Sequence, residues 1–286
     1  MLMDSAERLQ SSSALQQHYC AGMPQLGLYG LAENWLLKEC GHLHWMAIAR
    51  AQGMQLPEFV DAAGRKSYAA LTAVHLREAR LDAVAENAPF SLTVRAVSPG
   101  RAQHFSAQTL RTGNTRAARI ELLSAFVRRD AGSNRSIVRA PVEGAECGDR
   151  TLTDAALSLQ ARARLFRTGD GVARMGLQPA ARGSVLRAVD ITPCPHNDFN
   201  GAGLLYFASF QALADRAELA CFGLCPALTA ERELYFYGNI DPGETVRVEL
   251  LAARDDTSEF AHWWRVRRCA DGERIADLIT RKRRLP

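Results

Sequence analysis

The 286-residue sequence contains no uninterrupted apolar run long enough to cross a membrane. A spanning helix needs about 20 predominantly apolar residues, and no stretch approaches that length. Residues 1–17 also lack the apolar core of a secretory signal peptide. We therefore expect a cytoplasmic protein without a membrane partner.

Cysteine is scarce and scattered along the chain. Its seven cysteines are odd in number and do not form the framework of a disulfide-stapled domain. Three residues separate Cys221 from Cys225, but no second pair has the spacing of zinc ligands. His42 and His44, two positions apart on an expected helix, point to different faces and are poor metal partners. The sequence thus predicts reduced thiols and no metal site.

A strong excess of charge of one sign is missing as well. The net charge is only +4, and part of it lies in the terminal run Arg281, Lys282, Arg283 and Arg284. No zinc-finger or RNA-recognition signature accompanies the run, so we interpret it as a solvated tail and expect no nucleic-acid partner. Basic residues can also attract an acidic partner or a phosphate-bearing ligand.

Glycine-rich motifs for nucleotide cofactors are absent too. The Gly-x-Gly pieces in 27–30 and 201–203 do not have the Rossmann spacing, and we expect no permanently bound cofactor. The composition, 47% hydrophobic and 23% charged, is ordinary for a globular protein. Its length suits about two domains.

The order of the expected elements occurs twice. Dense tryptophan and leucine residues predict a buried helix over 31–53, and β-branched and aromatic runs separated by turn signals predict strands over 67–78, 90–97, 102–113 and 115–130. A mixed segment, 141–183, is interpreted as a linker with a short helix. The pattern then returns with a strand over 184–192, a polar loop over 193–203, a helix over 204–223, and strands over 233–239, 244–256, 260–269 and 273–284.

This repetition predicts a duplicated α+β unit. We expect an N-terminal leader over 1–20, a first unit over 21–140, the linker over 141–183 and a second unit over 184–286. In each unit, one long helix would bury a face of a curved antiparallel sheet, and the two sheets would pair at their edges. Two unrelated α+β domains are the alternative. Trp263 and Trp264, adjacent on one strand, would point to opposite faces and serve packing.

One segment resembles a known family. Residues 189–218 read VDITPCPHNDFNGAGLLYFASFQALADRAE and resemble the signature region of hot-dog-fold thioesterases, which has a strand, an Asp-containing loop and a helix opening with tyrosine. A closer resemblance is to the double hot-dog biosynthetic enzymes typified by the leinamycin-pathway bifunctional acyltransferase/decarboxylase. It covers nearly the whole chain from about residue 20, and it is carried by DFNGAGLLYFASFQALADRAE (198–218), GMPQLGLYGLAENWLL (22–37), GRKSYAALTAVHLR (64–77) and HWWRVRRCADGERIADLITRKR (262–283).

The resemblance implies a tandem hot-dog fold and a chemistry. Such an enzyme takes a methylmalonyl group from coenzyme A onto a tyrosine, decarboxylates it and passes the propionyl group to an acyl carrier protein. Tyr68, in SYAALTAV, matches the position of that tyrosine. A coenzyme A thioester would be the substrate and an acyl carrier protein the partner. Because a phenol has a pKa near 10, Tyr68 would need a nearby base or a lowered pKa; alternatively, it is a core aromatic.

The loop before the second long helix holds the other candidate residues. A thioester enzyme must stabilise an oxyanion, and the first N–H groups of a helix have no partners within the helix. Gly201, Ala202 and Gly203 would let the substrate approach this helix start, while Asn200 would cap the helix or donate a hydrogen bond. The alternative is that Asn200 and Gly201 simply form a turn.

Three further loop residues are candidates for catalysis. His196 would serve as a base, an acid or a donor to a substrate carboxylate, unless it is merely exposed. Asn197 is a similar candidate. Asp198 would activate water for hydrolysis or interact with the helix dipole.

Two other functions stay open beside acyl transfer with decarboxylation. One is a thioesterase or dehydratase that acts on acyl thioesters, and the other is a non-catalytic module that binds acyl chains or scaffolds a synthase. A homodimer of double units is a further expectation.

Overall fold

The computed structural model describes residues 14–100, 103–130, 132–142, 153–169, 173–179 and 184–285. None of the helices in this part of the chain is both long and apolar enough to cross a membrane. The first unit contains the long helix α1 (Glu33–Ala51), the 3₁₀ turn η2 (Leu81–Ala83) and the strands β1 (Leu15–Cys20), β2 (Leu26–Gly27), β3 (Gly30–Leu31), β4 (Tyr68–Arg77), β5 (Pro89–Gly100), β6 (Gln103–Thr112), β7 (Thr115–Asp130) and β8 (Ser133–Arg139).

The second unit repeats this arrangement after a connecting helix. That helix is α2 (Thr153–Thr168), and the unit comprises the short helix α3 (Pro195–Asp198), the long helix α4 (Phe207–Phe222) and the strands β9 (Arg187–Ile191), β10 (Ala227–Phe236), β11 (Val246–Asp255), β12 (Glu259–Arg268) and β13 (Arg274–Arg284). The expected helices over 31–53 and 204–223 are therefore confirmed to within three residues at each end.

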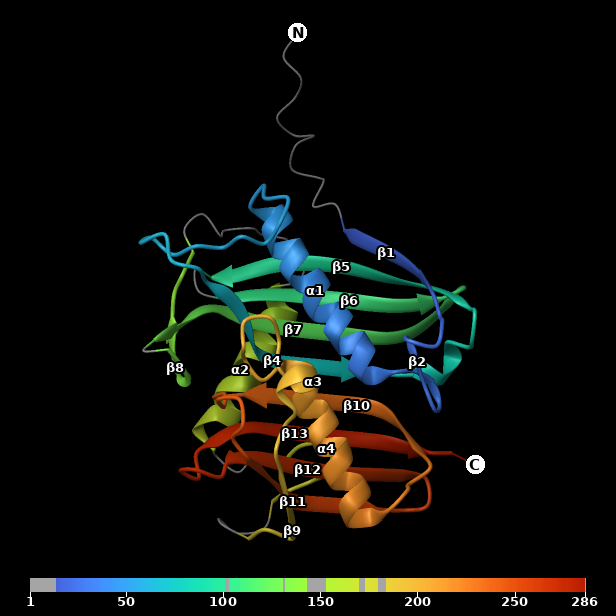
Figure 1. The fold of residues 1–286 in the computed structure, drawn as a ribbon. Coiled ribbons are helices and arrows are strands. Elements are labelled where there is room, and N and C mark those ends of the chain that lie inside the picture. Colours follow the sequence, from blue (N-terminus) through green and yellow to red (C-terminus); the bar gives the residue numbers. More distant parts are fainter. Residues whose placement is uncertain are drawn as a thin grey trace.

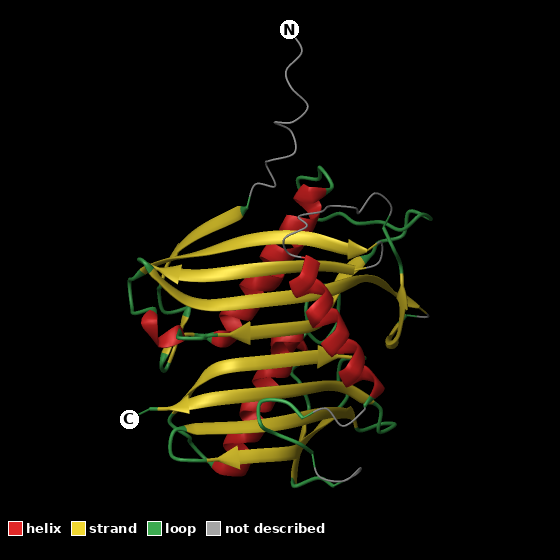
Figure 2. Cartoon of the chain, turned by 180° about the vertical axis from the view of Figure 1, so that it is seen from behind, coloured by secondary structure: helices red, strands yellow, loops and turns green. Residues whose placement is uncertain are grey.

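A single antiparallel sheet runs through both units. Its strand order is β1-β5-β6-β7-β4-β10-β13-β12-β11-β9, with β8 paired to β7 beside this path. β4 and β10 pair at the centre and join the two units, with Leu76 opposite Arg232 and Ala73 opposite Tyr235. Figure 1 shows α1 and α4 side by side on one face of the sheet. The reverse view in Figure 2 shows α2 crossing the other face.

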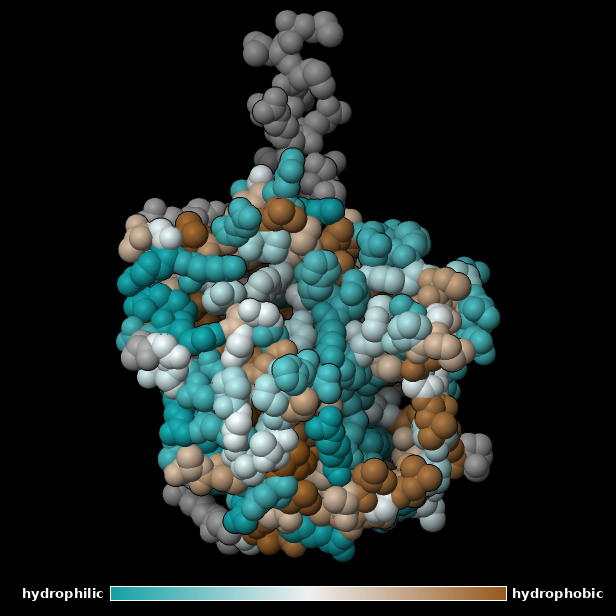
Figure 3. Space-filling view, in the orientation of Figure 1, coloured by the Kyte–Doolittle hydropathy of each residue, from teal (hydrophilic) through white to brown (hydrophobic). Residues whose placement is uncertain are grey.

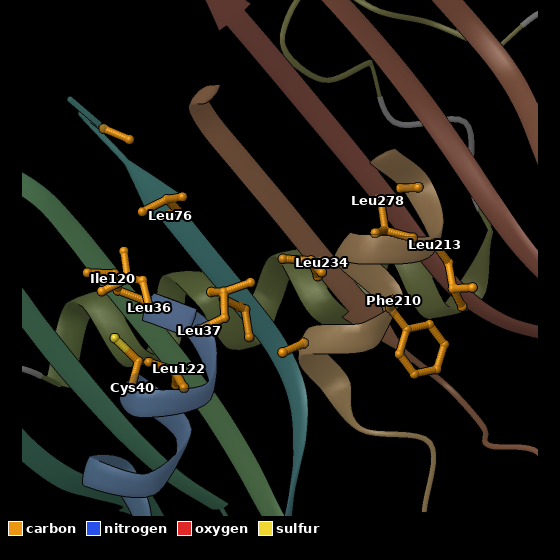
Figure 4. Close-up of a cluster of buried hydrophobic side chains, with 14 of the residues drawn as sticks. Leu36, Leu37, Cys40, Leu76, Ile120, Leu122, Phe210, Leu213, Leu234 and Leu278 are labelled. Carbon is orange, nitrogen blue, oxygen red and sulfur yellow. The ribbon is translucent and has the colours of Figure 1, made fainter. Parts of the chain in front are cut away.

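The main core lies between the sheet and the two long helices. Leu36, Leu37, Cys40 and Leu43 recur at helical spacing on α1, and all are buried. They meet side chains from β4 and β7, while Phe210 and Leu213 of α4 pack in the same cluster (Figure 4). A second core lies under α2.

The adjacent tryptophans show how one strand serves both cores. Trp264 packs in the main core and Trp263 in the core under α2, so the expected alternation of faces is confirmed. Figure 3 shows a largely hydrophilic surface on the helix-bearing side, with hydrophobic residues gathered near its lower edge. Leu219, Phe222 and Leu224, at the end of α4, are among the exposed apolar side chains.

Several local expectations differ from the structure. Part of the expected leader forms β1, an edge strand hydrogen-bonded to β5. β8 was not expected, β10 begins six residues before the expected strand over 233–239, and the linker helix α2 has 16 residues rather than being short. These segments gain their structure from pairing and packing across the chain, which local periodicity does not encode.

The interpretation of the terminal basic run as a solvated tail is wrong. Its residues belong to β13, and the four cationic groups pair with carboxylates elsewhere in the fold: Arg281 with Glu231 and Glu259, Lys282 with Glu218, Arg283 with Asp82, and Arg284 with Asp255. The run looked unpaired because its partners are distant in sequence.

Candidate active site

A cavity of about 760 Å³ lies where β4 begins and β10 ends. Both units line it, together with the loop that leads into α4. Tyr68, Asn200, Gly201 and Ala202 are among the lining residues. The fold thus brings the candidate nucleophile of the first unit and the candidate loop of the second into one cavity, although they are more than 130 residues apart in sequence.

The other candidate residues of the loop lie outside the cavity lining. His196 and Asn197 are exposed on α3. The Asp198 carboxylate is buried, accepts a hydrogen bond from the Cys194 N–H at 2.7 Å and lies 3.6 Å from the Arg216 guanidinium. Its backbone oxygen accepts from the Tyr206 N–H. The contacts of Asp198 therefore hold α3 and the start of α4 together.

Asn200 folds the glycine-bearing bend upon itself. Its side-chain oxygen accepts hydrogen bonds from the N–H groups of Ala202 at 3.0 Å and Leu204 at 3.1 Å, and its backbone oxygen accepts from Gly203. Three amide hydrogens of the bend are thus already bonded, contrary to our expectation that the bend offers them to a substrate. Gly203 has a φ of +71°, a conformation that favours glycine. The side-chain amide nitrogen of Asn200 stays available as a donor.

Unpaired amide hydrogens occur instead at the start of α4. Its N-cap residue, Tyr206, makes no side-chain cap. In the described part of the chain, the N–H groups of Phe207 and Ala208 have no hydrogen-bond acceptor. Phe207 lines the cavity. The helix start therefore provides donors and partial positive charge beside the cavity.

Two asparagines from other elements fix the approach to this helix. Asn239 brackets Leu205: its side-chain oxygen accepts from the Leu205 N–H at 2.9 Å, and its nitrogen donates to the Leu205 oxygen at 3.1 Å. Asn134, on β8, donates to the Gly203 oxygen at 2.6 Å. Both asparagines line the cavity. No sequence pattern pointed to these two asparagines, because each lies far along the chain from the loop it holds.

Tyr68 lies at the start of β4 with its ring among cationic and aromatic neighbours. The Lys66 ammonium is 5.5 Å from the centre of the Tyr68 ring, and the Trp45 ring is 6.1 Å away. Within the described residues, the Tyr68 hydroxyl has no hydrogen-bond partner. A hydroxyl that no protein group occupies, in a cavity wall, is open to a substrate. Tyr68 is half-buried on β4, so its placement is compatible with a catalytic role and with that of a core aromatic.

Tyr206 is the second phenol in the cavity wall. Burial raises its pKa to about 12, with the charges of Glu39 and Cys40 contributing in the same direction. The hydroxyl is therefore neutral at physiological pH, and it donates to the Lys38 backbone oxygen at 3.4 Å. Tyr237 also lines the cavity, but its hydroxyl donates to the Asp277 carboxylate at 3.0 Å. Of the three phenols, only Tyr68 combines a free hydroxyl with a neighbouring cation.

The charge around the cavity has one sign. The described lining residues include four cationic side chains and no aspartate or glutamate; the four are Lys66, Arg135, Arg139 and Arg167. Arg167 comes from α2, on the opposite face of the sheet, and its guanidinium donates to the Phe236 oxygen at 3.3 Å. Such a cavity favours anionic ligands. The linker helix contributes to it, a role that the sequence did not indicate.

Elsewhere in the molecule, three side chains that could together bind a metal ion are paired with arginines instead. His75, Glu231 and Glu233 present ligand atoms within 4.8 Å of one another. However, Arg174 binds Glu233 through two hydrogen bonds of 2.8 and 2.6 Å, and Arg281 binds Glu231 at 3.0 Å. His75 and Arg281 hold the pKa of Glu231 down, at about 2. Guanidinium groups at these carboxylates leave no place for a metal cation.

Solved structures share this architecture over their full length. A 12:0-ACP thioesterase from Umbellularia californica superposes with a TM-score of 0.64 and 11% identity, covering 94% of this chain and 97% of that one. A Lactobacillus plantarum protein described as an oleoyl thioesterase superposes with a TM-score of 0.66 and 13% identity over 96% of both chains. The chain has a double hot-dog fold.

A third similar structure carries a different name. A MaoC-like dehydratase from Phytophthora capsici superposes with a TM-score of 0.50 and 10% identity, again over 96% of both chains. No family profile matches the sequence, and no curated protein matches it. At these identities the likeness establishes the fold, and the expected tandem hot-dog architecture is confirmed.

Proposed function

We propose that this double hot-dog protein is an enzyme that acts on acyl thioesters of coenzyme A or of an acyl carrier protein. The observation that carries the proposal is the cavity at the start of α4, which combines unpaired amide hydrogens, the free Tyr68 hydroxyl and a cationic lining. Aromatic and aliphatic residues such as Trp45, Phe210 and Phe236 provide apolar walls for an acyl group. The thioesterase names of two structural neighbours support the same substrate class.

The cationic lining suits the rest of such a substrate. Coenzyme A and the prosthetic arm of a carrier protein both carry phosphate, and guanidinium groups bind phosphate in a fork geometry. Arg139 and Arg167 are the residues we expect to meet these anions or a carboxylate on the acyl group. We expect no permanently bound cofactor.

The first reaction that we propose for these cavity residues is acyl transfer with decarboxylation. The Tyr68 oxygen would attack the thioester carbonyl, the C–S bond would break, and the thiol would leave with the phenol proton. The bond between the α-carbon and the carboxylate of a malonyl-type group would then break and release carbon dioxide. The resulting enolate oxygen would be stabilised by the N–H groups of Phe207 and Ala208 and by the Asn200 side chain, before protonation at carbon.

The last step would regenerate the free Tyr68 hydroxyl. A carrier-protein thiol would attack the tyrosyl ester, and the acyl group would leave on sulfur while Tyr68 regains its proton. No described lining residue bears a carboxylate that could act as a base. The proposed route relies instead on the Tyr68 hydroxyl and the N–H groups at the start of α4.

Thioester hydrolysis is the second candidate, and the structural neighbours favour it. Hydrolysis needs a general base for water. Among the described lining residues, His42 on α1 is the only imidazole. Asp198, which we expected as the water activator, lies outside the cavity lining and is bonded to Cys194. Dehydration needs an acid and a base across the two units, and the described lining supplies no carboxylate for that pair.

One incubation separates these reactions. The protein is mixed with methylmalonyl- or malonyl-coenzyme A and a carrier protein bearing its phosphopantetheine arm, and intact masses are recorded. Propionyl or acetyl groups on the carrier support transfer with decarboxylation. Free acid without carrier loading supports hydrolysis. Thioesters that stay unchanged would refute an enzymatic function and leave an acyl-binding module.

The tyrosyl ester is tested with paired phenol variants. Tyr68→Phe should abolish carrier loading and the acyl adduct on the protein, whereas Tyr29→Phe, outside the cavity, should preserve both. Full carrier loading by Tyr68→Phe would exclude the ester while leaving thioester chemistry intact.

A further inference from the structure

The central strand pair β4–β10 has a hollow at each of its ends. The cavity described above lies where β4 begins and β10 ends. A second hollow of about 800 Å³ lies at the opposite end, where residues 77–80 meet residues 230–231. Ten residues of β4 separate the two ends by about 30 Å. Its strand residues Arg77, Glu231 and Arg281 lie on the face of the sheet that α2 covers, opposite the face that carries α1 and α4.

The interior of the sheet beside this hollow is closed. Arg232, next to Glu231 on β10, faces the other side of the sheet, toward α1 and α4, and does not line the hollow. It is fully buried and lies 2.8 Å from the Asp215 carboxylate of α4 and 2.6 Å from the Glu33 carboxylate of α1.

The lining of the second hollow is rich in arginine. We define the arginine basin as the lining of this hollow, which has six arginines, two glutamates, one asparagine and two alanines; the arginines are Arg77, Arg80, Arg111, Arg116, Arg281 and Arg283. It contains no aromatic or large aliphatic side chain. Its composition suits an anion rather than an acyl chain.

The carboxylates nearby do not neutralise the whole basin. Arg116 pairs with Glu78 at 2.7 Å, and three other arginines pair with acids on neighbouring strands and on η2. Such pairs hold guanidinium groups in fixed places. Arg80 has no ion pair within the described residues, and Arg111 donates only to the Asn114 backbone oxygen at 2.8 Å. Both are exposed and supply the excess positive charge.

We propose that the arginine basin binds a phosphate-bearing small molecule through Arg80 and Arg111. Guanidinium groups match the geometry of phosphate oxygens, and a hollow of about 800 Å³ lies within the range of small-molecule sites, roughly 300–1,000 Å³. The basin offers no apolar wall for an acyl chain, because its lining holds no aromatic or large aliphatic side chain. This site is independent of the acyl-thioester chemistry proposed above.

The test measures binding of inorganic pyrophosphate to the full-length protein by isothermal titration calorimetry. The wild-type protein should bind pyrophosphate saturably, and Arg80→Ala combined with Arg111→Ala should weaken the affinity at least tenfold. These arginines bridge no carboxylate, so the double variant should keep its unfolding temperature. Arg50→Ala is the matched control, since Arg50 is exposed on α1 and lies outside both hollows.

Two further measurements distinguish the basin from the cavity and a phosphate ligand from a carboxylate ligand. Tyr68→Phe should leave basin binding unchanged, which distinguishes failure of this proposal from failure of the proposed function. Binding of citrate as tightly as pyrophosphate would show a site for carboxylates, and the phosphate proposal would be overturned. No saturable binding, or equal binding by the wild type and the double arginine variant, would overturn it as well.

Discussion

Gly41 on α1 and Phe207 at the start of α4 lie in direct contact across the two units. A Cβ atom on Gly41 would lie 2.6 Å from the Phe207 Cε1 atom and 3.2 Å from the Tyr206 hydroxyl. The helix α1 continues without a break through Gly41. Because Gly41 has no side chain, the two helices approach each other closely, and both residues form part of the cavity wall.

Gly41→Ala should therefore destabilise the protein despite the better helix propensity of alanine. Forced repacking costs about 1–3 kcal/mol, which exceeds the gain of about 1 kcal/mol from replacing a helical glycine. Urea unfolding measures the difference. Gly201→Ala is the control, because a Cβ there meets nothing within 4 Å and its φ is not positive. A more stable Gly41→Ala protein would show that the helices can separate without cost.

Two substitutions of Asn200 separate its structural and chemical roles. Asn200→Ala removes the acceptor for two amide hydrogens and should cost about 1 kcal/mol of stability. Asn200→Asp keeps that acceptor but loses the amide donor, so it should fold with near wild-type stability. If the donor stabilises an enolate or oxyanion, Asn200→Asp should lower turnover at least tenfold with an unchanged unfolding midpoint. Unchanged turnover would restrict Asn200 to holding the bend.

His44 should make the fold sensitive to mild acid. It is fully buried, with its two ring nitrogens 2.8 Å from the Ser106 and Ser124 hydroxyls, and burial lowers its pKa to about 3, helped by His104. The unfolded chain binds this proton near pH 6.5, so the folded state loses stability as the pH falls from there toward 3, by about 1.4 kcal/mol per pH unit.

The measurement for His44 compares unfolding free energies between pH 7 and pH 5. His44→Gln keeps polar contacts with the two serines but cannot titrate, and its stability should fall less steeply over this interval. Parallel pH profiles for the two proteins would mean that His44 is not the responsible group.

Arg232 should be among the least tolerant positions. Arg232→Met leaves the Glu33 and Asp215 carboxylates without their buried cation, and breaking such a pair costs about 3–5 kcal/mol. Adding Glu33→Gln and Asp215→Asn should recover part of the loss, because the uncompensated charges are removed. Chemical denaturation of the single and triple variants provides the test; a single variant as stable as the wild type would contradict a structural role for this cluster.

Local patterns were sufficient for the long elements. The spacing of Leu36, Leu37, Leu43 and Ile48 predicts a buried helix, and alternation predicts that Trp263 and Trp264 face opposite sides. Both predictions are confirmed, because the spacing of buried side chains along a helix or a strand is a property of residues close together in sequence. β8 and the early start of β10 were missed, since their strand character depends on partners that are distant in sequence.

The candidate site could be predicted only in part, because its geometry also depends on contacts between residues distant in sequence. A distinctive run, DFNGAGLLYF, led to a loop that borders the cavity, and the match at SYAALTAV led to Tyr68, which lines the same cavity. His196 and Asn197 shared that loop but turn to the surface, because the short helix α3 determines which side chains face inward. Spacing alone gives no such direction.

The sequence by itself determined two repeats, each with one apolar helix and a run of antiparallel strands, because the periodicities of side-chain burial are local. Only the tertiary structure decided that Arg167 of the linker helix reaches the cavity, that the basic run at the end of the chain is paired, and that buried Arg232 joins Glu33 of α1 to Asp215 of α4. Those outcomes depend on which strand edges meet, and long-range pairing fixes them through contacts between residues that no local pattern connects.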